Sequence, residues 1–246
     1  MILLSYYGWK EWEYDNILSS SSYNASTSYD RLFGVPNAND VPLAYGTGAI
    51  LLWDIPLGIF APSLQDTIML LHHVGMFSVA AVMSGMVSNG RMIGYYYVPF
   101  YFGVIETSSV FLSVVDQFHP KRVEWYDWLH CNGEDEKEKS RMKRLLLGCN
   151  EVCRMGFAIS FIVLRGVYFP YTSFFHCIPD IWRVYYVEKT VPEGVPMWTG
   201  YFLILALVLF SCLQSYWGFL VGRQVKKALF GDDDAKKKKK KDKKKV

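Results

Sequence analysis

Seven ionisable side chains lie within or beside long apolar segments of this 246-residue chain, and they are its strongest candidates for chemistry. They are Asp54, Asp66, His72, His73, Glu106, Arg154 and Arg165. Placing such a group near the middle of a membrane helix costs about 2.5–3.5 kcal/mol, so these groups usually face the interior of a helical bundle. The sequence therefore predicts a polar cavity inside a membrane domain.

The adjacent histidines His72 and His73 are the central pair. On a helix they point about 100° apart and could line two walls of one cleft. Asp66 lies seven residues before His73, so we expect both on one helix face, and Glu106 is the expected partner from the next apolar segment. An imidazole can act as a general base while a carboxylate fixes its tautomer. We expect His73 to be the base; the alternative is a structural pair held by interhelical hydrogen bonds.

We expect the other ionisable groups to make polar contacts in the cavity or to form buried ion pairs. Asp54 lies in the first apolar segment, and Arg154 and Arg165 are eleven residues apart, close to three helical turns. The two arginines are therefore expected on one face. Interhelical hydrogen bonding is the structural alternative for each of them.

Metal and nucleic-acid chemistry are not expected. Three of the five histidines (His119, His130 and His176) stand alone, and the chain has no HExxH motif. Membrane metal oxidases need several histidine clusters, so no metal ligands are assigned. The basic residues are not interleaved with aromatic ones, which argues against nucleic-acid binding. Five cysteines, an odd number, do not make a disulfide framework, and Cys149 and Cys153 are expected as small residues on one helix face.

Long apolar segments predict the elements that position these residues. Each is long enough to cross a membrane as a helix, which needs about 20 apolar residues. They cover residues 41–62, 64–90, 92–115, 148–170 and 197–222. Residues 171–187 are interrupted by Pro179, Asp180 and Arg183, and we expect an interfacial or re-entrant piece there. The predicted fold is an all-α transmembrane bundle of about five to six spans.

Charge predicts the orientation of this bundle. Of the 26 lysines and arginines, 7 lie in residues 120–144 and 12 in residues 223–246. The positive-inside rule places both segments in the cytosol. The expected organisation is then a lumenal segment 1–40, a transmembrane domain 41–222 and a cytosolic lysine-rich tail 223–246. Asn24, in an Asn-Ala-Ser tripeptide, falls on the lumenal side and could be glycosylated.

The tail ends in three lysines and a valine, which places Lys243 and Lys244 at the fourth and third positions from the end. This spacing fits a dilysine retrieval signal, which predicts residence in the endoplasmic reticulum membrane with coat machinery as a partner. The alternative is a solvated lysine run that contacts anionic lipid, at about 1 kcal/mol per residue near the surface.

Four short motifs, in order over residues 40–222, resemble the TLC domain, named for TRAM, Lag1 and CLN8 proteins. They are LWDIP at 52–56, MLLHHV at 69–74, YFGVIETSSVFL at 101–112, and the Phe-rich segment 157–161 followed by Arg165 and Pro170. The resemblance implies a bundle of about six helices around a lipid-accessible cavity in the endoplasmic reticulum. Residues 1–9 resemble the end of the family's first helix, which suggests a truncated or divergent start.

The resemblance also implies three possible functions. In the ceramide synthase branch, the residues matching His72 and His73 catalyse N-acylation of a sphingoid base, with acyl-CoA as co-substrate and no other cofactor. That branch's His-Asp-x-Ser-Asp element is absent near 95–112, where only Glu106 and the following Thr-Ser-Ser stand. The chain therefore looks closer to TLC-domain-only proteins, which imply membrane lipids as partners and a role in lipid homeostasis. An adaptor for secretory cargo or the translocon is the third possibility.

Overall fold

The computed structural model describes residues 1–12, 27–60, 66–118 and 137–230, and this described part of the chain is helical with no β-strand. Four of its helices are long and apolar enough to cross a membrane: Asp40–Phe60, Tyr95–Phe118, Lys143–Val187 and Trp198–Lys227. A shorter apolar helix, Thr67–Met83, lies between the first two. The predicted all-α membrane bundle is therefore confirmed.

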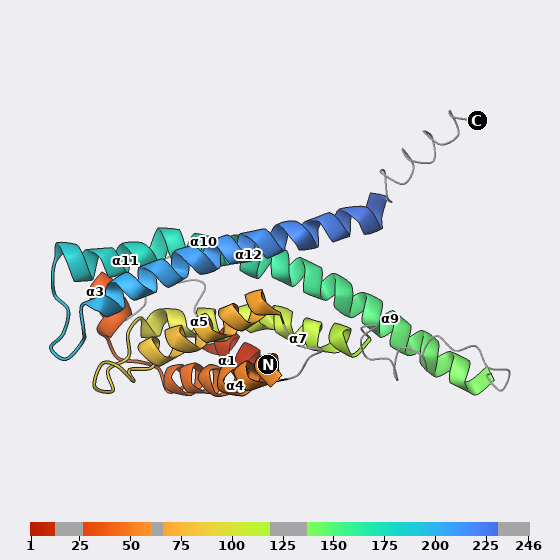
Figure 1. The fold of residues 1–246 in the computed structure, drawn as a ribbon, viewed down its shortest axis with the longest axis horizontal. Coiled ribbons are helices and arrows are strands. Elements are labelled where there is room, and N and C mark those ends of the chain that lie inside the picture. Colours follow the sequence, from red (N-terminus) through yellow and green to blue (C-terminus); the bar gives the residue numbers. More distant parts are fainter. Residues whose placement is uncertain (13–26, 61–65, 119–136, 231–246) are drawn as a thin grey trace, which may run out of the picture.

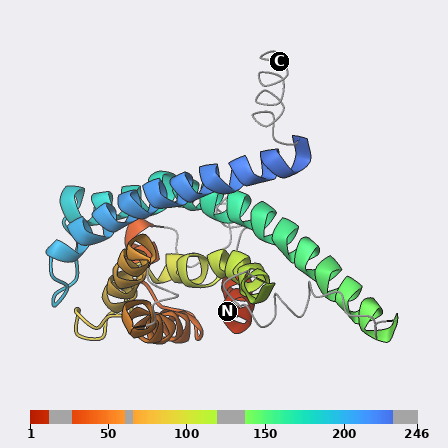
Figure 2. The same cartoon turned by 45° about the vertical axis from the view of Figure 1, so that its right-hand side comes forward.

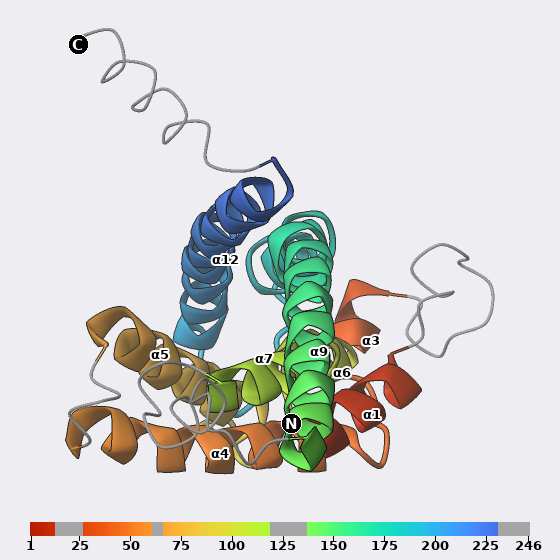
Figure 3. The ribbon, with the colours of Figure 1, turned by 90° about the vertical axis from the view of Figure 1, so that its right-hand side faces the viewer.

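The helices form two layers (Figures 1–3). One holds α1 (Ile2–Glu11), α4 (Asp40–Phe60), α5 (Thr67–Met83) and α7 (Thr107–Val115), with α4 packed along α5. The other holds α12 (Trp198–Phe230) and the continuous helix 137–187, which contact each other. Figure 3 shows this second layer lying over the first, with α9 (Lys137–Ser160) crossing α7.

Large apolar side chains cover the outside of the bundle. On α4, for example, Leu52, Trp53 and Phe60 are 58%, 70% and 81% exposed. An outward-facing apolar surface of this kind is unusual on a soluble monomer and is what lipid contact requires. The exposed apolar surface and the helix lengths together make the chain a membrane protein.

The third apolar segment is a broken helix rather than a regular span. It runs through η2 (Tyr95–Tyr97), α6 (Val98–Phe102), η3 (Val104–Glu106), α7 and η4 (Asp116–Phe118). Its first half is the core of the molecule, with Tyr97, Phe100 and Phe102 fully buried. Because neighbouring helices surround this segment, they can satisfy backbone groups that an irregular helix leaves free.

Residues 171–187 continue the preceding helix, so the predicted re-entrant piece is wrong and the predicted interfacial location stays a prediction. After α9 come η5 (Phe161–Tyr168), α10 (Phe169–Thr172), η6 (Ser173–Cys177), α11 (Ile178–Trp182) and η7 (Arg183–Val187) without a break. The three η segments are wider, π-helical turns. Pro170 and Pro179 each stand in the first turn of the α-helical stretch that follows a π-helical one, a position where proline is tolerated.

The interruption by Asp180 also has a structural cause. Asp180 is buried and accepts hydrogen bonds from the Arg31 guanidinium at 2.5 and 2.6 Å and from the Tyr97 hydroxyl at 2.5 Å. Arg31 belongs to α3 (Ser28–Phe33), which begins at a capping box made by Thr27 and Asp30. The pair ties the N-terminal segment onto the end of the long helix.

Helix α1 is part of the bundle. Gly8 of α1 and Gly103 lie so close that their backbones are in contact. A Cβ atom added to Gly8 would lie only 2.4 Å from the Gly103 Cα. Beside this contact, the Ser5 hydroxyl lies 2.8 Å from that of Thr107, and Trp9 Nε1 donates to Thr107 at 2.9 Å. The apolar start of the chain therefore packs against the core segment and brings Met1 and Leu4 to the cavity described next.

Candidate functional site

A cavity of about 510 Å³ lies between the two layers and collects most of the predicted polar residues. Its walls come from α1, α4, α5, the η3–α7 segment, the long helix and α12. Five of the seven candidates line it: Asp54, His72, His73, Glu106 and Arg165. The cavity extends to Asp116 and Gln224, near the ends of the third apolar segment and of α12. The predicted juxtaposition of these five residues across four helices is the central finding about the site.

The best-defined contact in the cavity is the buried ion pair between Glu106 and Arg165. Arg165 Nη2 lies 3.2 Å from Glu106 Oε1, and both side chains are about nine-tenths buried. The guanidinium also donates to the Ser108 hydroxyl at 2.8 Å, the Ser109 hydroxyl at 2.9 Å and the Ile105 carbonyl at 3.3 Å. Buried charges persist only when they are paired and hydrogen-bonded, and this pair meets that condition.

Ser108 and Ser109 were not among the sequence candidates. Both hydroxyls face Arg165 because the helix continues from Glu106 directly into α7, which places the three side chains on neighbouring positions of one turn. The sequence feature that could have indicated them is their position two and three residues after Glu106, the only carboxylate of the apolar segment 92–115. A serine is too common in membrane helices for this spacing to single it out.

His72 is the most enclosed ionisable group on the α5 side of the cavity. Its ring is held edge-on by Phe210 and Trp217 of α12, with centroid distances of 5.4 and 5.2 Å. It is 9% exposed, and its Nδ1 atom is buried with no hydrogen-bond partner among the described residues. An unpartnered buried polar atom costs about 1–3 kcal/mol, so this nitrogen is a candidate hydrogen-bonding group for a ligand in the cavity.

His73 lies next to His72, with ring centroids 5.8 Å apart, and is only partly buried. It faces the same cavity as Asp54 of α4. Both imidazoles line this one cavity from α5. Asp54, rather than Asp66, is the carboxylate that shares this part of the cavity with His73.

Asp66 does not belong to the site. It is the residue before α5 begins, where its carboxylate accepts hydrogen bonds from the backbone N–H groups of Ile68 and Met69 at 2.9 and 3.1 Å. An N-cap carboxylate satisfies helix-end donors that have no partner within the helix. The predicted shared face with His73 is wrong, because the helix begins after Asp66 and not before it.

Arg154 does not belong to the site either. Its side chain is 60% exposed and pairs with Glu151 on the same helix at 3.3 Å. The predicted shared face with Arg165 is wrong, because the π-helical segment η5 begins between them and alters the turn per residue. Arg165 points into the cavity while Arg154 points outward.

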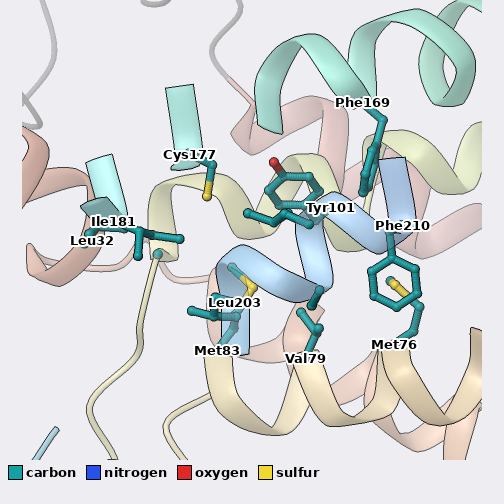
Figure 4. A pocket seen from close by; sticks show the side chains of 13 residues that line it. Leu32, Met76, Val79, Met83, Tyr101, Phe169, Cys177, Ile181, Leu203 and Phe210 are labelled. Carbon is teal, nitrogen blue, oxygen red and sulfur yellow. The ribbon is translucent and has the colours of Figure 1, made fainter. Parts of the chain in front are cut away.

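A second, apolar pocket of about 20 Å³ continues from the cavity between α5 and α12. Figure 4 shows Met76 and Val79 of α5 facing Leu203 and Phe210 of α12 across this space. Met76 lines both the pocket and the polar cavity. The small apolar pocket and the polar cavity are therefore neighbours that share Met76 in their walls.

The predicted glycosylation site, Asn24, and the predicted retrieval signal, Lys243 and Lys244, lie outside the described residues. Among the residues that are described, no group of three or more histidine, cysteine, aspartate or glutamate side chains could hold a metal ion. Comparisons with protein-family models, curated proteins and solved structures gave no match for this chain.

Proposed function

We propose that this chain is a multi-pass endomembrane protein that binds a membrane lipid in the cavity between its two layers and acts in lipid homeostasis. The observation that carries the proposal is the gathering of His72, His73, Glu106, Arg165 and Asp54 around one cavity within an otherwise apolar bundle. Ionisable groups inside a membrane domain are costly and mark a functional site by default.

The shape of the site favours an amphipathic ligand. A polar headgroup fits the part lined by the imidazoles and carboxylates, where the unpartnered His72 Nδ1 offers a hydrogen bond. An acyl chain of such a ligand would contact Met76 and Phe210 between α5 and α12, and these side chains would have to move aside to admit it. Methionine side chains adapt readily to an inserted chain, which supports Met76 as the residue between the two parts. The resemblance of the four motifs to the TLC domain supports the same ligand class.

The His72 Nδ1 atom also supports a second function, N-acyl transfer from acyl-CoA to a sphingoid base. In that reaction the amine nitrogen attacks the thioester carbonyl, the carbon–sulfur bond breaks, and coenzyme A leaves as its thiol. A histidine at the cavity would accept the amine proton. The structure favours His72 over the expected His73 for this role, because His72 is the more enclosed and has the unpartnered nitrogen.

The proposed location is the endoplasmic reticulum membrane with a cytosolic C-terminus. The lysine spacing at Lys243 and Lys244 supports retrieval by coat machinery, and cargo or translocon association through the tail is the third candidate function. Replacing both lysines by serine should then move the protein to later compartments in cell fractionation. Unchanged fractionation would leave a plain solvated tail.

Replacement of each histidine by leucine tests the lipid proposal. We expect His72→Leu to lower the amount of co-purifying lipid per protein at least about tenfold, a change of about 1.4 kcal/mol in binding. Stability in detergent should be kept or raised, because an unpartnered buried nitrogen is removed. His176→Leu, on η6 outside the cavity, is the matched control and should keep its lipid. Lipid content is measured by mass spectrometry of the purified full chain.

The same preparations separate the two functions. Turnover of sphingoid base and acyl-CoA that disappears in His72→Leu would establish acyl transfer. Lipid binding without turnover would leave lipid homeostasis as the function. Loss of lipid and of thermal stability together in His72→Leu would overturn the cavity proposal and make the histidine a structural residue.

A further inference from the structure

Two cysteines lie together on α9, on its surface. Cys149 is exposed and Cys153 is partly exposed, and their thiols lie one helical turn apart, within hydrogen-bonding reach of each other. Among the described residues, neither packs in the core, in contrast to Cys177, which is buried. The pair is therefore available to a reagent or enzyme at this surface.

Cys149 belongs to a stripe of apolar side chains on the outer face of α9. Leu145 lies four residues before it and Val152 three residues after it, and they are 68% and 70% exposed. Met155 and Ile159 extend the stripe with 63% and 61% exposure. A chain attached to Cys149 would lie along this apolar face and enter the lipid beside it.

The depth of the pair places it toward one membrane surface. Gly218 of α12 faces Gly166 of the long helix, and the two helices are antiparallel, so Arg223 falls near the level of Phe161. Cys153 lies eight residues farther along the helix, a rise of about 12 Å. Cys212, by contrast, is exposed on α12 well inside the charge-free stretch.

Basic residues adjoin the pair on the same helix. Lys143 and Arg144 lie six and five residues before Cys149, and the segment 120–144 that they end is the one the positive-inside rule assigns to the cytosol. Cysteines beside a membrane helix on that side are the usual acceptors of reversible S-acylation. An acyl chain adds about 0.8 kcal/mol of membrane affinity per buried methylene.

We propose that Cys149 and Cys153 form an S-acylation site, modified with long-chain fatty acyl groups from acyl-CoA by a membrane acyltransferase. The thiol sulfur attacks the thioester carbonyl, a new carbon–sulfur bond forms to cysteine, and the bond to coenzyme A breaks. The cysteine proton passes to the departing coenzyme A thiolate, so the exchange needs no oxidant. The acylated pair anchors the projecting part of α9 to the membrane surface.

Thioester counting on the full chain from cells tests this inference independently of lipid binding in the cavity. Free thiols are blocked, thioesters are cleaved with hydroxylamine, and the released thiols are labelled with a polyethylene-glycol maleimide that retards the protein on a gel. We expect a retarded band in the wild type that disappears in Cys149→Ser/Cys153→Ser. The matched control Cys212→Ser should keep the band, and all variants should elute as the wild type in gel filtration.

Three outcomes overturn the inference. They are no hydroxylamine-dependent band in the wild type, a band that persists in the double variant, and a band released only by a reducing agent. The last would show a disulfide instead. Retention of the band in a variant that has lost cavity lipid, such as His72→Leu, would support this inference while the proposed function is judged separately.

Discussion

Arg154 and Arg165 are two arginines on one continuous helix, but their side chains are in different environments. Arg154 is exposed and meets only its neighbour Glu151, whereas Arg165 is buried and makes four polar contacts across the helix interface. The energetic consequences differ, because an exposed pair contributes between about 0 and 1 kcal/mol whereas breaking a buried pair leaves an uncompensated charge.

Replacing Arg165 by glutamine should therefore destabilise the protein strongly. We expect a loss of about 3–5 kcal/mol, because Glu106 stays buried without its partner. The matched variant Arg154→Gln should change stability by no more than about 0.5 kcal/mol. The measurement is unfolding of both variants in the same detergent. Equal effects at the two positions would contradict the buried-pair interpretation.

At this scale the sequence predicts which residues matter better than how they are arranged. Ionisable groups in apolar segments are few, so five of the seven candidates do line the cavity. The exceptions, Asp66 and Arg154, depend on where a helix begins and on a local change of helical turn, neither of which residue spacing reveals. Which histidine is enclosed depends on Phe210 and Trp217, from a helix more than 130 residues away in sequence.

The helices depend on each other through a few close contacts, of which the one between α1 and the core segment is the tightest. Gly8 and Gly103 have no side chain to separate the two backbones. The contact holds α1 so that Met1 and Leu4 complete a wall of the cavity. Backbone approach through glycine is a common device for packing membrane helices.

Replacing Gly8 by alanine should disrupt this contact. The new Cβ would lie 2.4–2.5 Å from backbone atoms of Gly103 and Val104, which cannot move aside as a flexible side chain can. We expect a loss of about 1–3 kcal/mol from overpacking, and a lower lipid content because the cavity wall shifts. Gly222→Ala, where no atom lies within 4 Å, is the control. A Gly8→Ala protein as stable as this control would contradict the docking of α1.

The sequence predicted the positions of the helices better than their boundaries and internal irregularities. The apolar segments are found at their expected places, because about 20 apolar residues leave a membrane protein few alternatives. The broken helix 95–118 was expected as a regular span, since its irregular turns are supported by neighbours and not by its own composition. Pro179, Asp180 and Arg183 looked like interruptions because their partners and π-helical surroundings become visible only in three dimensions.

For the whole molecule, the described helix ends that adjoin the two basic segments lie at one end of the bundle. Figure 1 shows the ends of α7 and α12 and the start of α9 at the same end, opposite the connection between η7 and α12. These helix ends are compatible with the charge-based prediction that segment 120–144 and the tail share one side of the membrane.

Accessibility labelling should find both basic segments in the cytosol. A single cysteine introduced at position 137 in a cysteine-free chain should react with an impermeant maleimide only after the plasma membrane is permeabilised, with the endoplasmic reticulum intact. Positive charge resists translocation, which is the physical reason for this orientation. A matched cysteine at 190, in the connection before α12, should stay protected until the internal membrane is opened. The reverse pattern would contradict the topology.

Helix α5 has a consequence for the membrane itself. Its 17 residues span about 26 Å, less than the hydrocarbon thickness of about 30 Å in a typical bilayer. Its outer face, including Leu71 and Val74, is exposed and apolar, so a bilayer that covers this face has to thin locally to match the helix length. This mismatch favours thin membranes over sterol-rich thick ones. It also shortens the distance that a lipid headgroup must descend to reach the histidines on the other face of α5.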